Sequence, residues 1–225
     1  MTQTPGPPPV RGRAWTSSVP DAVFDRMQQG TMRTVYRGVP FFKSPFDIAL
    51  YLQLLSRQRT GTVIEIGTKF GGSALWFADM LTAHGNRDGR VVSVDIEHLV
   101  DFDDARIDFL HGDANSLDKV LTKDLLARCP RPFLVVEDSS HQYRETTAVL
   151  NYFHDHLRTG DYIVVEDGVV SRLSGEQYRR YDHGPNRGVA DFLDRHGVDY
   201  EIDTDLCDRY GHNATYNPNG WLRRR

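Results

Sequence analysis

The chain has 225 residues and carries 27 Lys and Arg against 31 Asp and Glu, which gives a formal net charge of −4. A chain of this length can bury the core of one domain, and its acidic balance excludes the basic surface of a typical nucleic-acid-binding protein. The two cysteines, Cys129 and Cys207, lie far apart without a CxxC motif, which excludes a redox pair and a zinc knuckle and indicates a cytoplasmic protein.

The N-terminal segment is rich in proline, with four of the 11 prolines of the chain between residues 5 and 9. We expect residues 1–14 to form a disordered tail and residues 15–225 to form a single domain. The tail lacks the apolar core of a secretory signal, and no later stretch reaches the roughly 18 apolar residues of a membrane span. We therefore expect no membrane partner, and we interpret the basic end, Arg223–Arg225, as solvated.

The middle of the chain alternates between short apolar runs and longer segments with helical spacing. A helix is predicted at residues 48–55, and further helices at 72–83, 97–105, 115–128 and 142–158. The apolar runs predict strands at Val63–Ile66, Val91–Val94, Arg106–Leu110, Phe133–Val136 and Tyr162–Val165. This alternation predicts an α/β fold with a doubly wound, mostly parallel sheet that is buried on both faces.

The last part of the chain predicts a helix at Pro185–His196 and a terminal pair of strands at Val198–Ile202 and Asn213–Tyr216. In doubly wound sheets, ligands bind beyond the carboxyl ends of the strands. The residues that follow each predicted strand are therefore the first candidates for function.

A glycine-rich turn follows the first strand, with Gly67, Gly71 and Gly72 leading into a helix. These glycines allow a tight turn, and the first N–H groups of the helix are free to bind a polar ligand. A plain strand–helix turn explains the glycines equally well. The spacing departs from GxGxxG, which disfavours an NAD- or FAD-binding site.

Acidic residues follow the second and third strands. Asp95 is placed to accept hydrogen bonds from ribose hydroxyls, and Asp113 to accept one from an adenine amino group. Each carboxylate alone is commonly a capping or solvated group. Acids in register after successive strands nevertheless favour a nucleoside-binding edge.

Two strand ends repeat the letters Val-Val-Glu-Asp, at Val135–Asp138 and Val164–Asp167. Adjacent parallel strands would bring these carboxylates to one place, where their repulsion favours a bound cation. Oxygen ligands without a Cys or His set favour Mg²⁺, with Mn²⁺ as the alternative, over zinc. Two solvated acidic strand ends are the competing interpretation.

His141 lies three residues after Asp138, on the loop that enters the next helix. A histidine there can take a proton from a hydroxyl group held on the metal, although a lone loop histidine is more often a surface residue. His154 and His156 are two residues apart on a helix, so they face different sides, and no HExxH motif is present.

In combination, these motifs resemble the cephalosporin hydroxylase/rhamnosyl O-methyltransferase family over residues 36–222. The motifs that carry the resemblance are Glu65–Gly67 with Gly71–Ser73, Val94–Asp95, Glu137–His141, Gly160–Asp167 and Gly211–Leu222. The resemblance implies a Rossmann-like class I methyltransferase fold that uses S-adenosylmethionine and Mg²⁺ to methylate hydroxyls of sugars or secondary metabolites in natural-product biosynthesis.

The resemblance also implies roles for individual residues. Asp138, Glu166 and Asp167 become metal ligands and His141 the general base, a layout similar to that of catechol O-methyltransferases. The implied cofactor-binding residues are Glu65, Gly67 and Ser73 at the methionine end, Asp95 at the ribose and Asp113 at the adenine.

We therefore predict in-line transfer of a methyl group to a hydroxyl of a small acceptor, with or without an attached sugar, by a homo-oligomeric enzyme. Oxidative chemistry like that of cephalosporin hydroxylases is the main alternative, and it is disfavoured because the sequence shows no two-His–one-carboxylate set for iron. An NAD(P)-dependent dehydrogenase and a catalytically silent family member are further alternatives.

Overall fold

Seven strands form one mixed sheet in the order β5-β4-β3-β6-β7-β9-β8 in the computed structural model, which describes residues 6–225. Strands β3 to β7 pair in parallel, and β9 runs antiparallel to both β7 and β8. The strands are β3 (Thr62–Ile66), β4 (Arg90–Asp95), β5 (Ile107–His111), β6 (Phe133–Glu137), β7 (Tyr162–Val165), β8 (Tyr200–Ile202) and β9 (Trp221–Arg224). The predicted fold class is confirmed.

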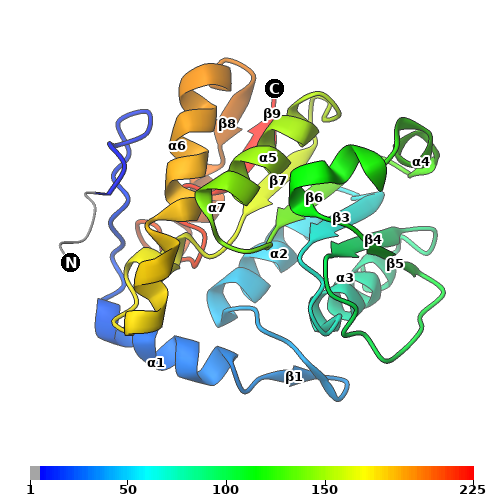
Figure 1. Cartoon of the computed structure of the whole chain (residues 1–225), viewed down its shortest axis with the longest axis horizontal. Coiled ribbons are helices and arrows are strands. Elements are labelled where there is room, and N and C mark those ends of the chain that lie inside the picture. Colours follow the sequence, from blue (N-terminus) through cyan, green and yellow to red (C-terminus); the bar gives the residue numbers. More distant parts are fainter. Residues whose placement is uncertain (1–5) are drawn as a thin grey trace.

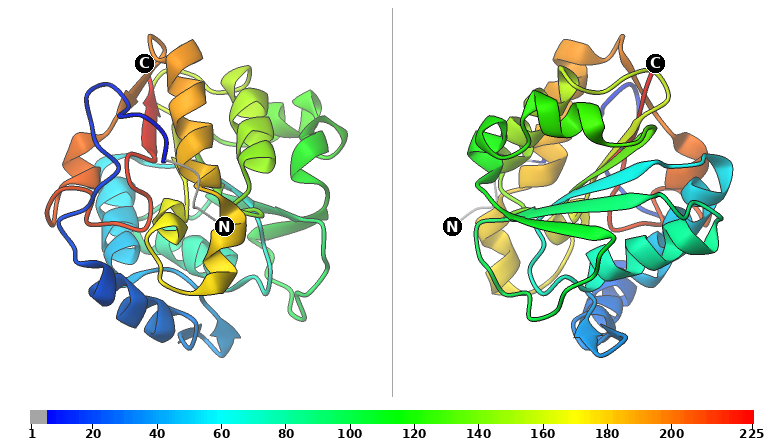
Figure 2. Two further views of the ribbon diagram at one scale, coloured as in Figure 1. Left: turned by 60° about the vertical axis from the view of Figure 1, so that its left-hand side comes forward. Right: turned by 90° about the vertical axis from the view of Figure 1, so that its right-hand side faces the viewer.

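Helices cover both faces of the sheet, so that the central strands are buried throughout (Figure 2). Helices α2 and α3 pack on one face, and α5 and α6 pack on the other and against each other. The helices are α1 (Asp21–Thr31), α2 (Pro45–Arg57), α3 (Gly72–Ala83), α4 (Lys123–Arg128), α5 (Tyr143–His154), α6 (Gly184–His196) and α7 (Thr204–Cys207). None of them, within residues 6–225, has the length and apolar character needed to cross a membrane.

The local sequence of helix α2 determines where the helix begins and which face it buries. Ser44 caps its first turn by accepting a hydrogen bond from the Asp47 N–H, and Pro45 occupies the first helical position, where its missing N–H costs nothing. The apolar side chains Leu50, Tyr51, Leu54 and Leu55 then fall on one face and are buried against the sheet.

Two predicted helices differ from the structure. Residues 97–105 form a loop, in which Asp95 accepts a hydrogen bond from the Glu97 N–H and so turns the chain away from a helix. The segment 115–128 contains a 3-10 helix, η1 (Ala114–Lys119), and then α4, because Thr122 caps a new helix by accepting from Leu125 N–H.

The last strand was predicted at the wrong place. Residues 213–216 form a loop, since Asn213 has a positive φ of 46° and its side chain donates to the carbonyl groups of Ala14 and Thr16. Strand β9 lies further along the chain. Arg223 and Arg224, which were interpreted as part of a solvated tail, therefore belong to the sheet.

The N-terminal region packs along one side of the domain (Figure 1). Residues 1–5 of the predicted tail lie outside the described residues. Further along, Val10 is buried and Arg13 forms an ion pair with Asp208, whose atoms are 2.7 Å apart. Helix α1 follows, and then a short hairpin of β1 (Val35–Tyr36) and β2 (Val39–Pro40). The boundary at residue 14 and the single-domain assignment stay predictions.

Candidate active site

A cleft of about 930 Å³ lies beyond the carboxyl ends of β3 to β7. The position agrees with the general rule for doubly wound sheets. The structure brings seven of the nine predicted site residues to its lining: Gly67, Ser73, Asp95, Asp113, Asp138, His141 and Asp167. The remaining two, Glu65 and Glu166, are buried outside this lining.

The turn after β3 requires glycine at its first position. Gly67 has a φ of 110°, and a Cβ atom there would lie 2.0 Å from the carbonyl oxygen of Asp138. The Asp138 N–H in turn donates to the carbonyl of Ile66 at 2.8 Å. The missing side chain therefore lets the β3 turn lie directly against the loop that carries the proposed metal ligand.

Glu65 is buried beneath the cleft and is not one of the lining residues. Its Oε2 accepts a 2.6 Å hydrogen bond from Ser93, whereas its Oε1 is buried without a partner. Burial raises the pKa of this carboxyl, and the nearby ammonium of Lys43 opposes that rise. The unpartnered oxygen suits a donor bound at the cleft floor.

Asp95 and Asp113 line the cleft and also act as local caps, so both interpretations of these acids apply. The two oxygens of Asp95 accept from the backbone N–H groups of Lys69 and Glu97, at 2.7 and 2.9 Å. Asp113 accepts from the Asn115 N–H at the start of η1, which lowers its pKa. The caps hold both carboxylates at the rim, where their remaining lone pairs can accept from a ligand.

The repeated Val-Val-Glu-Asp motifs lie on adjacent parallel strands, as predicted. The register pairs Glu137 with Val165, and the Glu166 N–H donates to the Glu137 carbonyl at 2.9 Å. This alignment brings Asp138 and Asp167 to the same wall of the cleft. Asp167 has a φ of 58°, in the left-handed region that is uncommon for a residue other than glycine.

Glu137, the first acid of its motif, faces away from the cleft. Its carboxylate is buried, where it accepts hydrogen bonds from Ser139 and from the Thr146 hydroxyl at 3.1 Å. Alternation along the strand explains this orientation. Glu137 anchors helix α5 to the sheet.

Lys43 is a functional candidate that the sequence analysis missed. Its ammonium is 3% exposed and donates to Asp138 Oδ2 at 2.5 Å and to Glu166 Oε2. The hydroxyl of Tyr51 donates to the other oxygen of Glu166 at 2.5 Å. Both oxygens of Glu166 thus have partners in the structure. A lone lysine within the apolar segment before α2 was the only sequence signal.

Charge interactions within this group shift several pKa values. Burial disfavours the Lys43 ammonium, but Asp138 and Glu166 outweigh it and raise the Lys43 pKa. Burial alone would raise the pKa of the Asp138 carboxyl, but Lys43 and His141 outweigh it and lower that pKa. Burial and the neighbouring acids raise the pKa of Glu166 and of Asp167. One internal cation therefore does not compensate all three acids, and a further cation in the cleft would favour their ionised forms.

His141 lies between the two acids of the cleft wall. Its Nε2 is 3.4 Å from Asp167 Oδ2, and its Nδ1 is 4.0 Å from Asp138 Oδ1. Potential ligand atoms of the three side chains lie within 4.8 Å of one another. Tyr181 packs edge-on against the imidazole, with ring centroids 5.3 Å apart. The two carboxylates offer the oxygen ligands that a hard divalent cation prefers, and the group contains no thiolate.

Two further segments that are distant in sequence also line the cleft. Helix α1 and the residue after it contribute Gln28, Thr31 and Met32. The connection 168–184 folds into two 3-10 helices, η2 (Gly168–Ser171) and η3 (Glu176–Tyr181), and also lines the cleft. A small apolar cluster joins these segments: Phe24, Val169, Leu173 and Tyr216.

The family model described as Rhamnosyl O-methyltransferase/CmcI matches residues 28–225 of the chain. The protein belongs to this family. The rhamnosyl O-methyltransferase of Mycobacterium bovis is 30% identical over 198 residues, which cover 85% of this chain and 78% of the relative. The corresponding enzyme of Mycobacterium leprae is 31% identical and covers 85% of this chain and 83% of the relative.

Solved structures of CmcI share the fold. A Mg–SAM structure of CmcI aligns with a TM-score of 0.67 and 25% identity, over 86% of this chain and 77% of that chain. An apo structure of CmcI aligns with a TM-score of 0.65 and 23% identity, over 86% of this chain and 76% of that chain. The predicted family and the prediction of a SAM-dependent O-methyltransferase are confirmed.

Proposed function

We propose that the protein transfers the methyl group of S-adenosylmethionine to a hydroxyl of a sugar or secondary metabolite in a reaction that requires Mg²⁺. The observation that carries the proposal is the convergence of Asp138, Asp167 and His141 on one wall of the cleft, within 4.8 Å of one another. The family membership supports it, since relatives are named rhamnosyl O-methyltransferases and a CmcI structure holds Mg and SAM.

S-adenosylmethionine, when bound, supplies the electrophilic methyl group. Its position is proposed along the β3 turn and the β4 and β5 ends, where Gly67 exposes backbone and Asp95 and Asp113 offer carboxylate oxygens. Ser73 lies in the same lining, at the start of α3, where helix N–H groups are free. Glu65, which lies below the cleft floor, would contact the methionine end of the cofactor through its unpartnered Oε1.

Asp138, Asp167 and Glu166 are the proposed ligands of Mg²⁺. Mg²⁺, when bound, supplies positive charge that lowers the pKa of an acceptor hydroxyl and fixes its orientation. Asp138 and Asp167 line the cleft, whereas Glu166 would have to exchange its contact with Lys43 for the ion. Mn²⁺ prefers similar oxygen ligands and remains the alternative ion.

His141 is the proposed general base. Asp167, 3.4 Å from its Nε2, is placed to hold the ring and to stabilise the imidazolium that forms when the ring accepts a proton. Tyr181 restricts the ring from its other side and excludes water from that face. The acidic surroundings favour the sulfonium substrate over the neutral product that remains after transfer.

A direct test is incubation of the protein with S-adenosylmethionine, Mg²⁺ and a panel of hydroxylated acceptors, with rhamnosides first because of the named relatives. Mass spectrometry should show an acceptor gaining one methyl group, and EDTA should abolish the gain. Methyl transfer that survives EDTA unchanged would contradict the role of the metal. Homo-oligomeric assembly and a cytoplasmic location belong to the same proposal, and light scattering tests the assembly.

A further inference from the structure

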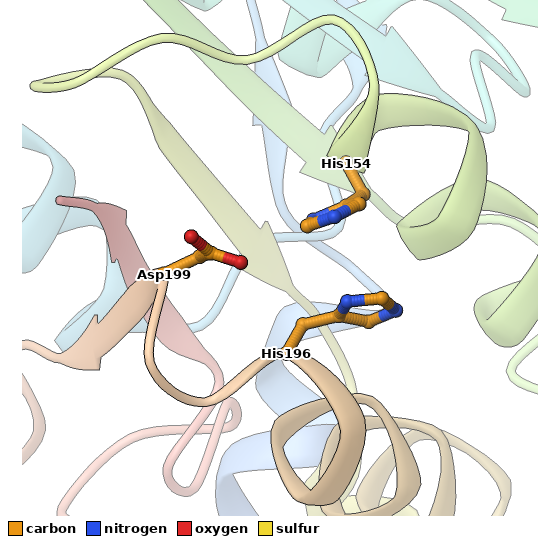
Figure 3. Close-up of side chains that lie close together, drawn as sticks. All are labelled: His154, His196 and Asp199. Carbon is orange, nitrogen blue, oxygen red and sulfur yellow. The ribbon is translucent and has the colours of Figure 1, made fainter.

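A second group of potential metal ligands lies at the edge of the sheet opposite the cleft. His154 ends α5, His196 ends α6, and Asp199 lies on the loop before β8 (Figure 3). Ligand atoms of the three side chains lie within 4.8 Å of one another. The fold thus forms a two-His–one-carboxylate set, which corrects the expectation that the chain has none.

The positions of these side chains are set by the surrounding structure. The Asp199 N–H donates to the His196 carbonyl at 3.0 Å, and this turn places both side chains on one side of the loop. The rings of His154 and His196 face each other, with centroids 3.9 Å apart. The buried rings of Phe192 and Tyr200 pack against His154 at 6.0 and 5.9 Å and restrict its orientation.

We propose that His154, His196 and Asp199 form a second metal site, which binds a divalent transition metal ion such as Zn²⁺ and joins the ends of α5 and α6 to the loop before β8. Two imidazoles and one carboxylate are a common ligand set for Zn²⁺ and leave a fourth position for water. Mg²⁺ prefers oxygen ligands, so the two edges of the sheet would select different ions.

The chemistry of the three side chains suits this role. A metal binds the neutral imidazole, and burial together with the facing His154 lowers the pKa of His196, which favours its neutral form. All three side chains are partly exposed, so an ion can reach them from solvent. A four-coordinate zinc ion holds its ligand atoms roughly 3–4 Å apart, which requires the cluster to contract and the two facing rings to turn so that their in-plane lone pairs converge.

Two cations near this group oppose a metal ion: Arg195, which acts on His196, and Arg224, which contacts the other two side chains. The Arg224 guanidinium lies 3.5 Å from Asp199 Oδ2 and 3.4 Å from His154 Nδ1, and it also packs over the Tyr200 ring at 4.9 Å. Arg224 therefore competes with the ion for two of the three proposed ligands. Its replacement should strengthen metal binding, whereas replacement of a ligand should weaken it.

The test measures Zn²⁺ binding to the full chain by equilibrium dialysis with metal analysis, in excess Mg²⁺. An Asp138→Asn background removes a ligand of the cleft, so that bound Zn²⁺ reports on the second site. We expect one equivalent of Zn²⁺, an affinity at least about tenfold lower after His196→Asn, and a higher affinity after Arg224→Gln. His156→Asn is the matched control, because His156 is close in sequence but stacks on Tyr152.

Absence of bound Zn²⁺, or equal affinity in the His196→Asn and His156→Asn proteins, would overturn the proposal. Circular dichroism verifies that each variant folds, and Asp199→Asn replaces His196→Asn if the latter does not. A Zn²⁺-dependent rise in Tm that is lost in His196→Asn but kept in His156→Asn would support the structural role. These measurements do not depend on methyl transfer, so the second site and the proposed function can fail separately.

Discussion

The two edges of the sheet carry ligand groups of opposite character. At the cleft, the buried Glu166 and the partly exposed Asp138 are acids already paired with the internal cation Lys43. At the far edge, His154 and His196 are partly exposed imidazoles beside an arginine. Helix α6 connects the two: a Cβ on its first residue, Gly184, would lie 2.4 Å from the His141 carbonyl, and its last residue is His196. Its 13 residues span roughly 20 Å.

The fold assembles the three potential ligands of the cleft and the three at the far edge in different ways. The cleft group comes from the ends of neighbouring strands, where the parallel register pairs Glu137 with Val165 and so brings the following acids close together. The far group depends on the crossing of two helices and on a turn after the second. Oxygen ligands at one edge and nitrogen ligands at the other predict different metals and different sensitivities to mutation.

The largest effect is expected for Asp138→Asn, which removes a proposed metal ligand of the cleft. Turnover should fall on the order of 10³-fold, because a bound metal contributes several kcal/mol to the transition state. Calorimetric titration should show that Mg²⁺ binding is lost as well. His196→Asn at the far edge should leave turnover within about twofold of wild type, and a similar loss there would contradict the separation of the two sites.

Lys43→Met tests whether the internal cation stabilises the cleft edge. Removing one partner of a buried ion pair leaves unpaired charge, so the free energy of unfolding in EDTA should fall by about 3–5 kcal/mol in urea denaturation. Arg224→Gln, at the more exposed pair with Asp199, should cost at most about 1 kcal/mol. The double variant Lys43→Met/Glu166→Gln should recover part of the loss, and no recovery would contradict the pairing.

Asp47 is a buried acid that forms no ion pair within residues 6–225. Burial raises its pKa from 3.8 to about 6, although Ser44, Thr215 and the Tyr216 N–H donate to it. The folded state therefore binds the proton more tightly than the unfolded chain, and the free energy of unfolding should fall by about 3 kcal/mol as pH rises from about 4 to 6.

Asp47→Asn should remove this part of the pH dependence, which the difference between wild-type and variant urea denaturation curves measures across that range. Asp138, beside Lys43, has a lowered pKa and should show the opposite sign. An unchanged pH profile in Asp47→Asn would show that this carboxyl does not titrate on unfolding.

The smallest of these effects is expected for His141→Ala. Loss of a general base should lower kcat about 10²-fold, while Mg²⁺ binding measured by calorimetry stays close to wild type. If Mg²⁺ binding is lost instead, His141 is a metal ligand with Asp138 and Asp167, as the distances within that group also allow. His156→Ala is the matched histidine control and should leave kcat unchanged.

Much of the sheet could be predicted, because strands buried on both faces appear as continuous apolar runs. The runs at residues 63–66, 133–136 and 162–165 match β3, β6 and β7 to within one residue at each end. Strand β9 could not be placed in this way. Residues Asn213–Tyr216, whose sequence resembles that of a strand, instead form a loop. Hydrogen bonds from the Asn213 side chain to the N-terminal segment hold this loop in place.

The residues of the candidate site also differ in how well the sequence predicts them. Asp138 and Asp167 were predictable because Asp138 directly follows β6 and Asp167 lies two residues after β7, and strand order brings them together. Lys43 precedes Asp138 by 95 positions, and only the packing of α2 places it there. His154 and His196 likewise meet through helix packing. Residues at strand ends could thus be inferred from local pattern, whereas residues that depend on tertiary packing could not.

Helix α1 and the 168–184 connection form a wall of the cleft that has a small core of its own, separate from the main core of the sheet. Phe24 of α1 and Tyr216 pack edge-on, with ring centroids 5.9 Å apart, and Val169 and Leu173 complete the cluster. The wall can therefore change as a unit while the strand ends stay in place. Exchange of α1 together with the 168–184 connection between family members is expected to alter the cleft lining while Asp138 and Asp167 stay in place.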